Sequence, residues 1–280
     1  MSASELLMSL EMGLIYGIIA IGIYLTFRII NFPDLTCDGS FVLGAAASSV
    51  LVKAGYNPFL GLLVASLAGS LAGLGTGILN TRFKVTDLLS GILVAFMLYS
   101  VNLKIMSAPN IAMVTERTAF ADGETLMILI IICFIIALSI GYLLTTDFGL
   151  GLRGIAFNKR LAQNGGVSIK AMIVIGLALS NSLIALGGAL FSQSQRFADI
   201  SSGTGTIVIG LASVMIGERI LPYRSLLVQL VSCLIGSILY RLFISLALHS
   251  DILGLETQDL NLITGLLIIA VMVTKRRSAC

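Results

Sequence analysis

The sequence is poor in charged residues and has no tryptophan. Only 11% of its 280 residues are Asp, Glu, Lys or Arg, whereas soluble globular domains carry about 25%. Histidine is nearly absent, with one residue in the chain. The low charge excludes an ordinary soluble domain. The single histidine excludes a metal site built on several histidines.

The sequence contains no cysteine motif typical of a metal site and no nucleotide-binding motif. The four cysteines, Cys37, Cys133, Cys233 and Cys280, have neither metal-site nor paired spacing. Two of them, Cys133 and Cys233, lie inside apolar runs. No G-x-x-x-x-G-K-[ST] word is present, so the chain lacks the loop that cradles ATP phosphates. The basic residues are scattered and form no stripe for nucleic acid. We therefore expect no enzymatic activity, metal or cofactor in this chain.

Long apolar runs are abundant, and hydrophobic residues make up 57% of the chain. A hydrocarbon core about 30 Å thick needs roughly 20 apolar helical residues. The sequence therefore predicts an all-α polytopic membrane protein, a single transmembrane domain over 1–280 with about nine spans (8–10). One predicted segment, 41–54, is short for a full crossing. The segments are Gly13–Ile30, Phe41–Ala54, Phe59–Leu79, Leu88–Met106, Leu126–Leu144, Ala171–Phe191, Ile207–Ile220, Leu226–Leu248 and Leu260–Thr274.

A polar, basic stretch at 147–169 separates two of these runs. Glycines at 149 and 151 are expected to break the incoming helix, and a short helix is expected over 152–164. Gly165 and Gly166 should end that helix. Positive charge favours the cytoplasmic side. Placing 147–169 there leaves about twelve basic residues on the cytoplasmic side and four outside, with an external N-terminus and a cytoplasmic C-terminus.

Two short sequence motifs occur twice, in the same order, along the chain. Phe32–Thr36 resembles Phe197–Ser201, and Leu89–Leu93 resembles Ile263–Leu267. On the predicted topology, the two copies of the first motif, 32–36 and 197–201, lie on opposite sides of the membrane. We therefore predict two inverted three-span repeats, about 31–106 and 196–274, around a pathway of broken helices. Chance matching of short apolar words is the alternative.

Polar residues at the start of each repeat are candidates for the translocation pathway. Charged groups inside a membrane are costly and often mark a pathway, and Pro33 disfavours helix just before this segment. In the alternative interpretation these residues only cap helices or lie in a solvated outer loop. The candidates are Asp34, Thr36, Asp38 and Ser40 in the first repeat and Asp199 and Ser201 in the second.

The basic stretch carries the pattern R-G-x-A-x-N-x-x-x-A-x-x-x-G, formed by Arg153, Gly154, Ala156, Asn158, Ala162 and Gly166. This pattern resembles the coupling loop of bacterial ABC importer permeases, within the branched-chain amino acid and ribose permease superfamily. The chain looks closest to its tryptophan/tyrosine-type uncharacterised uptake permeases. A D-L-[ST]-x-G-S word of that family is similar to 34–40, although this chain has one extra residue there.

The resemblance implies the permease subunit of an ATP-driven importer in the bacterial inner membrane. It would move a small solute, an aromatic or other amino acid, received from an extracytoplasmic solute-binding protein or lipoprotein. Two copies of the chain would pair with two ATP-binding cassette subunits, which would hold ATP and Mg²⁺. The sequence also allows a proton- or sodium-coupled secondary transporter using Asp34 and Asp199, or a membrane scaffold that transports nothing.

Overall fold

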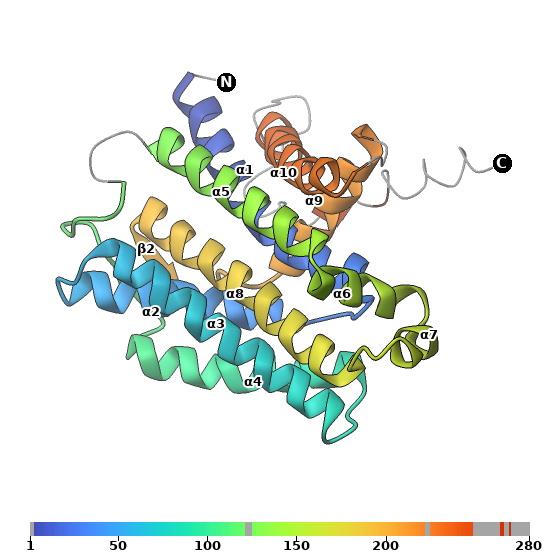
Figure 1. Cartoon of the computed structure of the whole chain (residues 1–280). Helices are drawn as coiled ribbons and strands as arrows, with labels where there is room; N and C mark the ends of the chain where they lie inside the picture. Colours follow the sequence, from blue (N-terminus) through green and yellow to red (C-terminus); the bar gives the residue numbers. More distant parts are fainter. Residues whose placement is uncertain (1–2, 121–124, 222–224, 249–263, 266–268, 270–280) are drawn as a thin grey trace.

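The computed structural model describes residues 3–120, 125–221 and 225–248, together with 264, 265 and 269. The described chain is a bundle of helices with one pair of short strands (Figure 1). Its elements are α1 (Ala3–Tyr24), the π-helix η1 (Leu25–Ile30), α2 (Cys37–Lys53), α3 (Pro58–Thr81), α4 (Asp87–Met106), β1 (Asn110–Ala112), α5 (Thr125–Thr145), α6 (Asp147–Phe157), α7 (Lys159–Asn164), α8 (Ile169–Gln195), β2 (Phe197–Asp199), α9 (Thr206–Ile220) and α10 (Leu226–Leu248).

Within the described part of the chain, six helices are long and apolar enough to cross a membrane, and each contains one of the predicted spans. The predicted segments at 41–54 and 207–220 are the shorter helices α2 and α9, of 17 and 15 residues. At 1.5 Å per residue, these two are about 26 and 23 Å long, less than a full hydrocarbon core. The predicted span at 260–274 lies almost entirely outside the described residues, so a count of nine stays a prediction.

Helix α8 lies in the middle of the bundle and packs closely on α2 and α3. Lipid supplies no hydrophobic force between helices, so their association depends on close packing. Glycines permit this close approach because they have no side chain. A Cβ at Gly73 of α3 would overlap the carbonyl group of Leu177, and one at Gly188 of α8 would overlap that of Phe41. The contact between these helices is therefore backbone against backbone.

The two short helices start beside each other inside the bundle. Asp38, in the first turn of α2, accepts hydrogen bonds from the backbone N–H groups of Gly205 (3.2 Å) and Ile207 (3.0 Å) at the start of α9. From there α2 runs toward β2, where Val52 shares a cluster with Ala198. Helix α9 runs toward η1 at the other end. This opposed arrangement fits the predicted inverted repeats, whose bounds stay predictions.

The two ends of the bundle differ in structure. Strands β1 and β2 pair antiparallel, with Ile111 opposite Ala198, and they lie near one end (Figure 1). Helices α6 and α7 project at the opposite end (Figure 1). We call these the strand end and the elbow end.

The close packing of α3 on α8 predicts a difference between two glycines of α3. Gly73→Ala forces a Cβ into the backbone of α8, whereas a Cβ at Gly75 has no atom within 4 Å. Both changes alter helix propensity equally, so they differ only in packing. We expect Gly73→Ala to lower the free energy of unfolding by about 1–3 kcal/mol, measured by denaturant unfolding in detergent micelles. Equal stability of the two variants would contradict this packing.

Candidate functional site

The stretch between α5 and α8 forms a helical elbow, residues 146–166. Thr146 caps α6, accepting a hydrogen bond from the N–H of Gly149 (3.5 Å). Asn158 is extended and separates α6 from α7. Its side-chain oxygen accepts hydrogen bonds from the N–H groups of Arg160 (3.0 Å) and Leu161 (3.1 Å), which caps α7. The Asn side chain thus sets the bend between the two helices.

Two sequence expectations for the elbow were wrong. Gly149 and Gly151 do not break the incoming helix: α5 ends at Thr145, and both glycines lie inside α6. Gly149 is needed for packing, because a Cβ there would overlap the backbone of Leu144. The single helix expected over 152–164 is two helices, since Asn158 supplies a cap and ends α6. The expected stop at 165–166 is confirmed, with Gly166 at φ +85°.

The elbow buries one side and exposes an apolar tip. Leu152 and Ile155 of α6 are each 1% exposed, whereas α7 has no buried residue. At the tip, Phe157 is 93% exposed and Leu161 is 71% exposed. Large apolar side chains this exposed at a helix end, outside the bundle, are suited to contact another protein.

The residues of the predicted coupling pattern are distributed along this elbow. Arg153, Gly154 and Ala156 lie on α6, Asn158 is the bend, Ala162 lies on α7, and Gly166 follows it. Gly154 faces α7, where a Cβ would make only an ordinary van der Waals contact, 3.8 Å from the Cβ of Ala162. Several pattern residues therefore shape the elbow, and Phe157 and Leu161, which the pattern leaves unspecified, form its tip.

A second polar group lies within the bundle around Asp34. The Asp34 carboxylate is fully buried and accepts hydrogen bonds from the Thr36 N–H (2.8 Å) and the Asn181 amide (2.7 Å). The Asn181 side-chain oxygen accepts a hydrogen bond from Ser40 (2.7 Å). The hydroxyl groups of Thr36 and Thr76 also bond at 2.7 Å. Sequence reasoning missed Asn181 and Thr76, whose only signal was a polar residue within an apolar run.

The remaining predicted pathway residues lie in two different places. Asp38 caps α9 and lines a cavity of about 130 Å³. Asp199 ends β2 and Ser201 lies in the turn that follows, where Asp199 accepts a hydrogen bond from the N–H of Ser201 (2.7 Å). The structure therefore brings Asp34, Thr36 and Ser40 together. It does not bring Asp199 to them.

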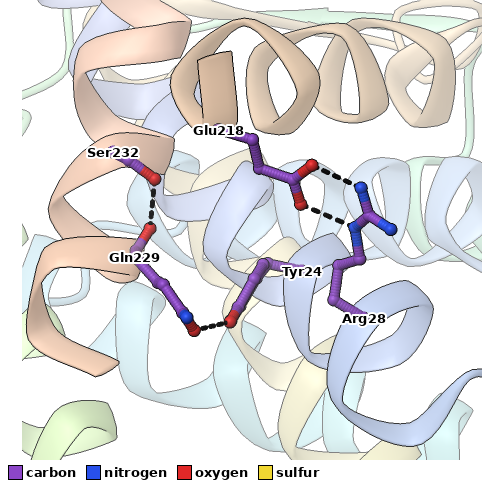
Figure 2. A network of polar contacts seen from close by, with 5 residues as sticks. All are labelled: Tyr24, Arg28, Glu218, Gln229 and Ser232. Carbon is purple, nitrogen blue, oxygen red and sulfur yellow. Dashed lines mark hydrogen bonds and ion pairs between the residues drawn. The ribbon is translucent and has the colours of Figure 1, made fainter. Parts of the chain in front are cut away.

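A polar network ties the ends of three helices together near the elbow end (Figure 2). Arg28 of η1 forms a two-point ion pair with Glu218 of α9, with its Nε 2.6 Å from one carboxylate oxygen. Tyr24 donates a hydrogen bond to the side chain of Gln229, and Ser232 donates one to the Gln229 carbonyl group (2.7 Å). These contacts join η1 to α9 and α1 to α10, close to the end of α9.

The buried network makes Asn181 a stability determinant. Asn181→Leu removes the amide donor to Asp34 and the acceptor for Ser40. Unsatisfied buried groups cost about 1–3 kcal/mol each, so we expect the free energy of unfolding in detergent to fall by about that amount or more. The same change at exposed Asn164 serves as the control. If both variants unfolded like the wild type, the network would not contribute to stability.

Comparison with known proteins gives consistent matches over nearly the whole chain. Residues 6–272 match the family model described as "Branched-chain amino acid transport system / permease component". The tyrosine transport system permease protein of Clostridioides difficile is 37% identical over 273 residues, 97% of this chain and 91% of that protein. An uncharacterized protein of Rickettsia prowazekii is 34% identical over 94% of this chain and 95% of its own length.

Among solved structures, one similar chain belongs to an ABC transporter of proposed metal-chelate type in an inward-facing conformation. It has a TM-score of 0.49 and 18% identity, and the match covers 97% of this chain and 86% of that one. The family assignment rests on the sequence matches. From these, the chain belongs to the branched-chain amino acid transport permease family, the membrane-spanning permease components of ABC transporters.

Proposed function

We propose that this permease belongs to an importer and that the elbow transmits the action of ATP to it. The exposed tip, Phe157 and Leu161 at the end of the capped helices α6 and α7, is the observation that carries the proposal. A permease without a nucleotide-binding loop needs a contact with its ATP-binding subunit. The apolar side chains of the tip, with Lys159 and Arg160 between them in sequence, would supply that contact. ATP and Mg²⁺ would be held by that subunit.

The proposed transmission follows from the rigidity of the elbow. Leu152 and Ile155 fasten α6 to the bundle, and α6 contacts both η1 and α8. A push on the tip would reach η1, whose Arg28 holds the end of α9 through Glu218. Coupling between two sites requires an element with two arrangements. In this proposal α9, a short helix held at each end by polar contacts, is that element.

The pathway is proposed to pass the junction of α2 and α9. Broken helices whose ends meet inside a membrane are a common way to build a substrate site. Asp38 lies at this junction with Thr36 and Ser40 nearby in sequence, whereas Asp199 and Ser201 would lie at the outer entrance. Asp34 is already bonded within the bundle to Thr36 and Asn181, which favours a structural role for it and gives no support to an ion-coupled carrier.

The substrate class and partners are proposed by analogy with the relatives. Amino acids are the proposed cargo, an aromatic one by likeness to the tyrosine transport system permease. The strand end would face outward and receive the cargo from an extracytoplasmic solute-binding protein or lipoprotein. Two copies of this chain would pair with two ATP-binding subunits in the bacterial inner membrane, with the N-terminus outside and the C-terminus in the cytoplasm.

The elbow assignment predicts the effect of a charge at its tip. Leu161→Asp places a carboxylate in the proposed apolar contact, and we expect affinity for the ATP-binding subunit to fall at least about tenfold, because central apolar anchors dominate interfaces. Binding would be measured between purified subunits in nanodiscs. Val114→Asp, at a similarly exposed residue (69%) beside β1, is the matched control. Unchanged binding of Leu161→Asp would remove the elbow as the docking site.

Transport direction and energy source are tested with the complete transporter in proteoliposomes. With the binding protein outside and ATP trapped inside, we expect accumulation of labelled tyrosine that persists when ionophores dissipate proton and sodium gradients. Omitting ATP should abolish accumulation. Uptake that needs an ion gradient and not ATP would instead identify a secondary transporter.

A further inference from the structure

The cavity at the junction of α2, α4 and the turn before α9 has a lining suited to one kind of chemical group. Its walls include apolar side chains from three segments: Val42 of α2, Ala95 of α4 and Ile200 of the turn. Its polar lining residues are Asp38, Asn102, Tyr99 and Thr204, and Asp38 is the only charged residue among the lining residues described. The site is thus negatively charged, with apolar walls.

The Asp38 carboxylate has capacity left for a ligand. An ionised carboxyl group offers about four acceptor positions, and the N–H groups of Gly205 and Ile207 occupy one on each oxygen. These two contacts also hold the carboxylate against the N-terminus of α9, where the helix dipole favours negative charge. The remaining positions can accept hydrogen bonds from a cationic donor.

Asn102 supplies a second acceptor beside the same cavity. Its side chain is 1% exposed, and its amide nitrogen donates to the Gly39 carbonyl group at 3.1 Å. That bond fixes the amide, and its oxygen is buried with no hydrogen-bond partner among the described residues. A buried acceptor without a partner is uncommon in proteins. A hydrogen-bond donor on a bound ligand would satisfy this oxygen.

The aromatic ring of Tyr99 forms the rim. Tyr99 is 56% exposed, one α-helical turn before Asn102 on the same face of α4. Aromatic faces attract cations. A volume of about 130 Å³ holds several water-sized groups, enough for an ammonium group together with its neighbouring carbon atoms. A ligand larger than this would extend past Tyr99.

We propose that this cavity binds the ammonium group of the transported solute, with Asp38 and Asn102 as acceptors and Tyr99 beside the cation. The proposal rests on the proposed transport function and deepens it. It names a primary amine, such as that of an amino acid, as the feature that the permease itself recognises. Neutral sugars and carboxylic acids without an amine would lack this contact.

Saturation-transfer NMR on the permease in nanodiscs, with its ATP-binding subunit and without the binding protein, tests the proposal. The probes are L-tyrosine, tyramine and 3-(4-hydroxyphenyl)propionate, which share one ring and differ in their charged groups. We expect signal transfer to tyrosine and tyramine, which carry the amine, and at least about tenfold less to the propionate. Equal transfer to all three probes would overturn the proposal.

Substitutions assign the binding to this cavity. Asp38→Asn keeps one of the two side-chain acceptors for α9 and removes the charge, so tyramine affinity should fall about tenfold. Asp87→Asn, the same change at the far end of α4, is the control. Since Asp38 also caps α9, Tyr99→Leu provides a second variant at an exposed position, with an expected fall of several-fold. Wild-type affinity in Tyr99→Leu together with a folded, wild-type-like Asp38→Asn would overturn the site.

This outcome is separable from that of the proposed function. If the proteoliposomes accumulate tyrosine with ATP but the amine-free probe binds the permease equally well, the importer stands and the ammonium site fails. If the proteoliposomes show no ATP-driven uptake while tyramine binding depends on Asp38, the ammonium site stands and the importer fails.

Discussion

The contact of Asp38 with the start of α9 holds the centre of this molecule together. A helix that begins inside a bundle exposes backbone N–H groups that water cannot reach, and each one left unpaired is costly in a membrane. Asp38 satisfies two of them with one carboxylate. Because this residue lies in the first turn of α2, one side chain fixes two broken helices to each other. Residues of α2, α4 and the turn before α9 line the cavity beside it.

The other polar groups of the bundle follow the same rule. Asp34, Thr36 and Ser40 precede or open α2, and each finds a partner on α3, α8 or the adjacent backbone. At the other end of α9, Glu218 pairs with Arg28. Polar contacts therefore hold α9 at both ends. Between those ends Gly210 and Gly217 allow close approach to the side chain of Ile23 and the backbone of Ser232.

The elbow obeys a different constraint, because it lies outside the apolar bundle. Its helices are too short to be stable alone, so they depend on caps at Thr146 and Asn158 and on the buried side of α6. The same caps place Phe157 and Leu161 where the bundle cannot cover them. The buried side of α6 and the exposed apolar tip therefore lie on opposite sides of one short segment, so the proposed partner contact does not compete with the packing that supports it.

The sequence by itself determined the membrane class, the six long spans and the projecting basic stretch, because apolar length and charge are local properties. The coupling pattern also located the elbow and its glycine stop. Tertiary structure alone decided that Gly149 and Gly151 lie within a helix, that Asn158 divides the elbow, and that Asn181 and Thr76 complete the network around Asp34. It also placed Asp38 against the start of α9. The partners of Asp34, Thr36 and Asp38 come from segments 40 to 169 residues apart, and a residue's own neighbours in sequence carry no record of that pairing. In the elbow the deciding contacts are local, since Asn158 bonds residues two and three positions ahead, but the apolar pattern does not specify them.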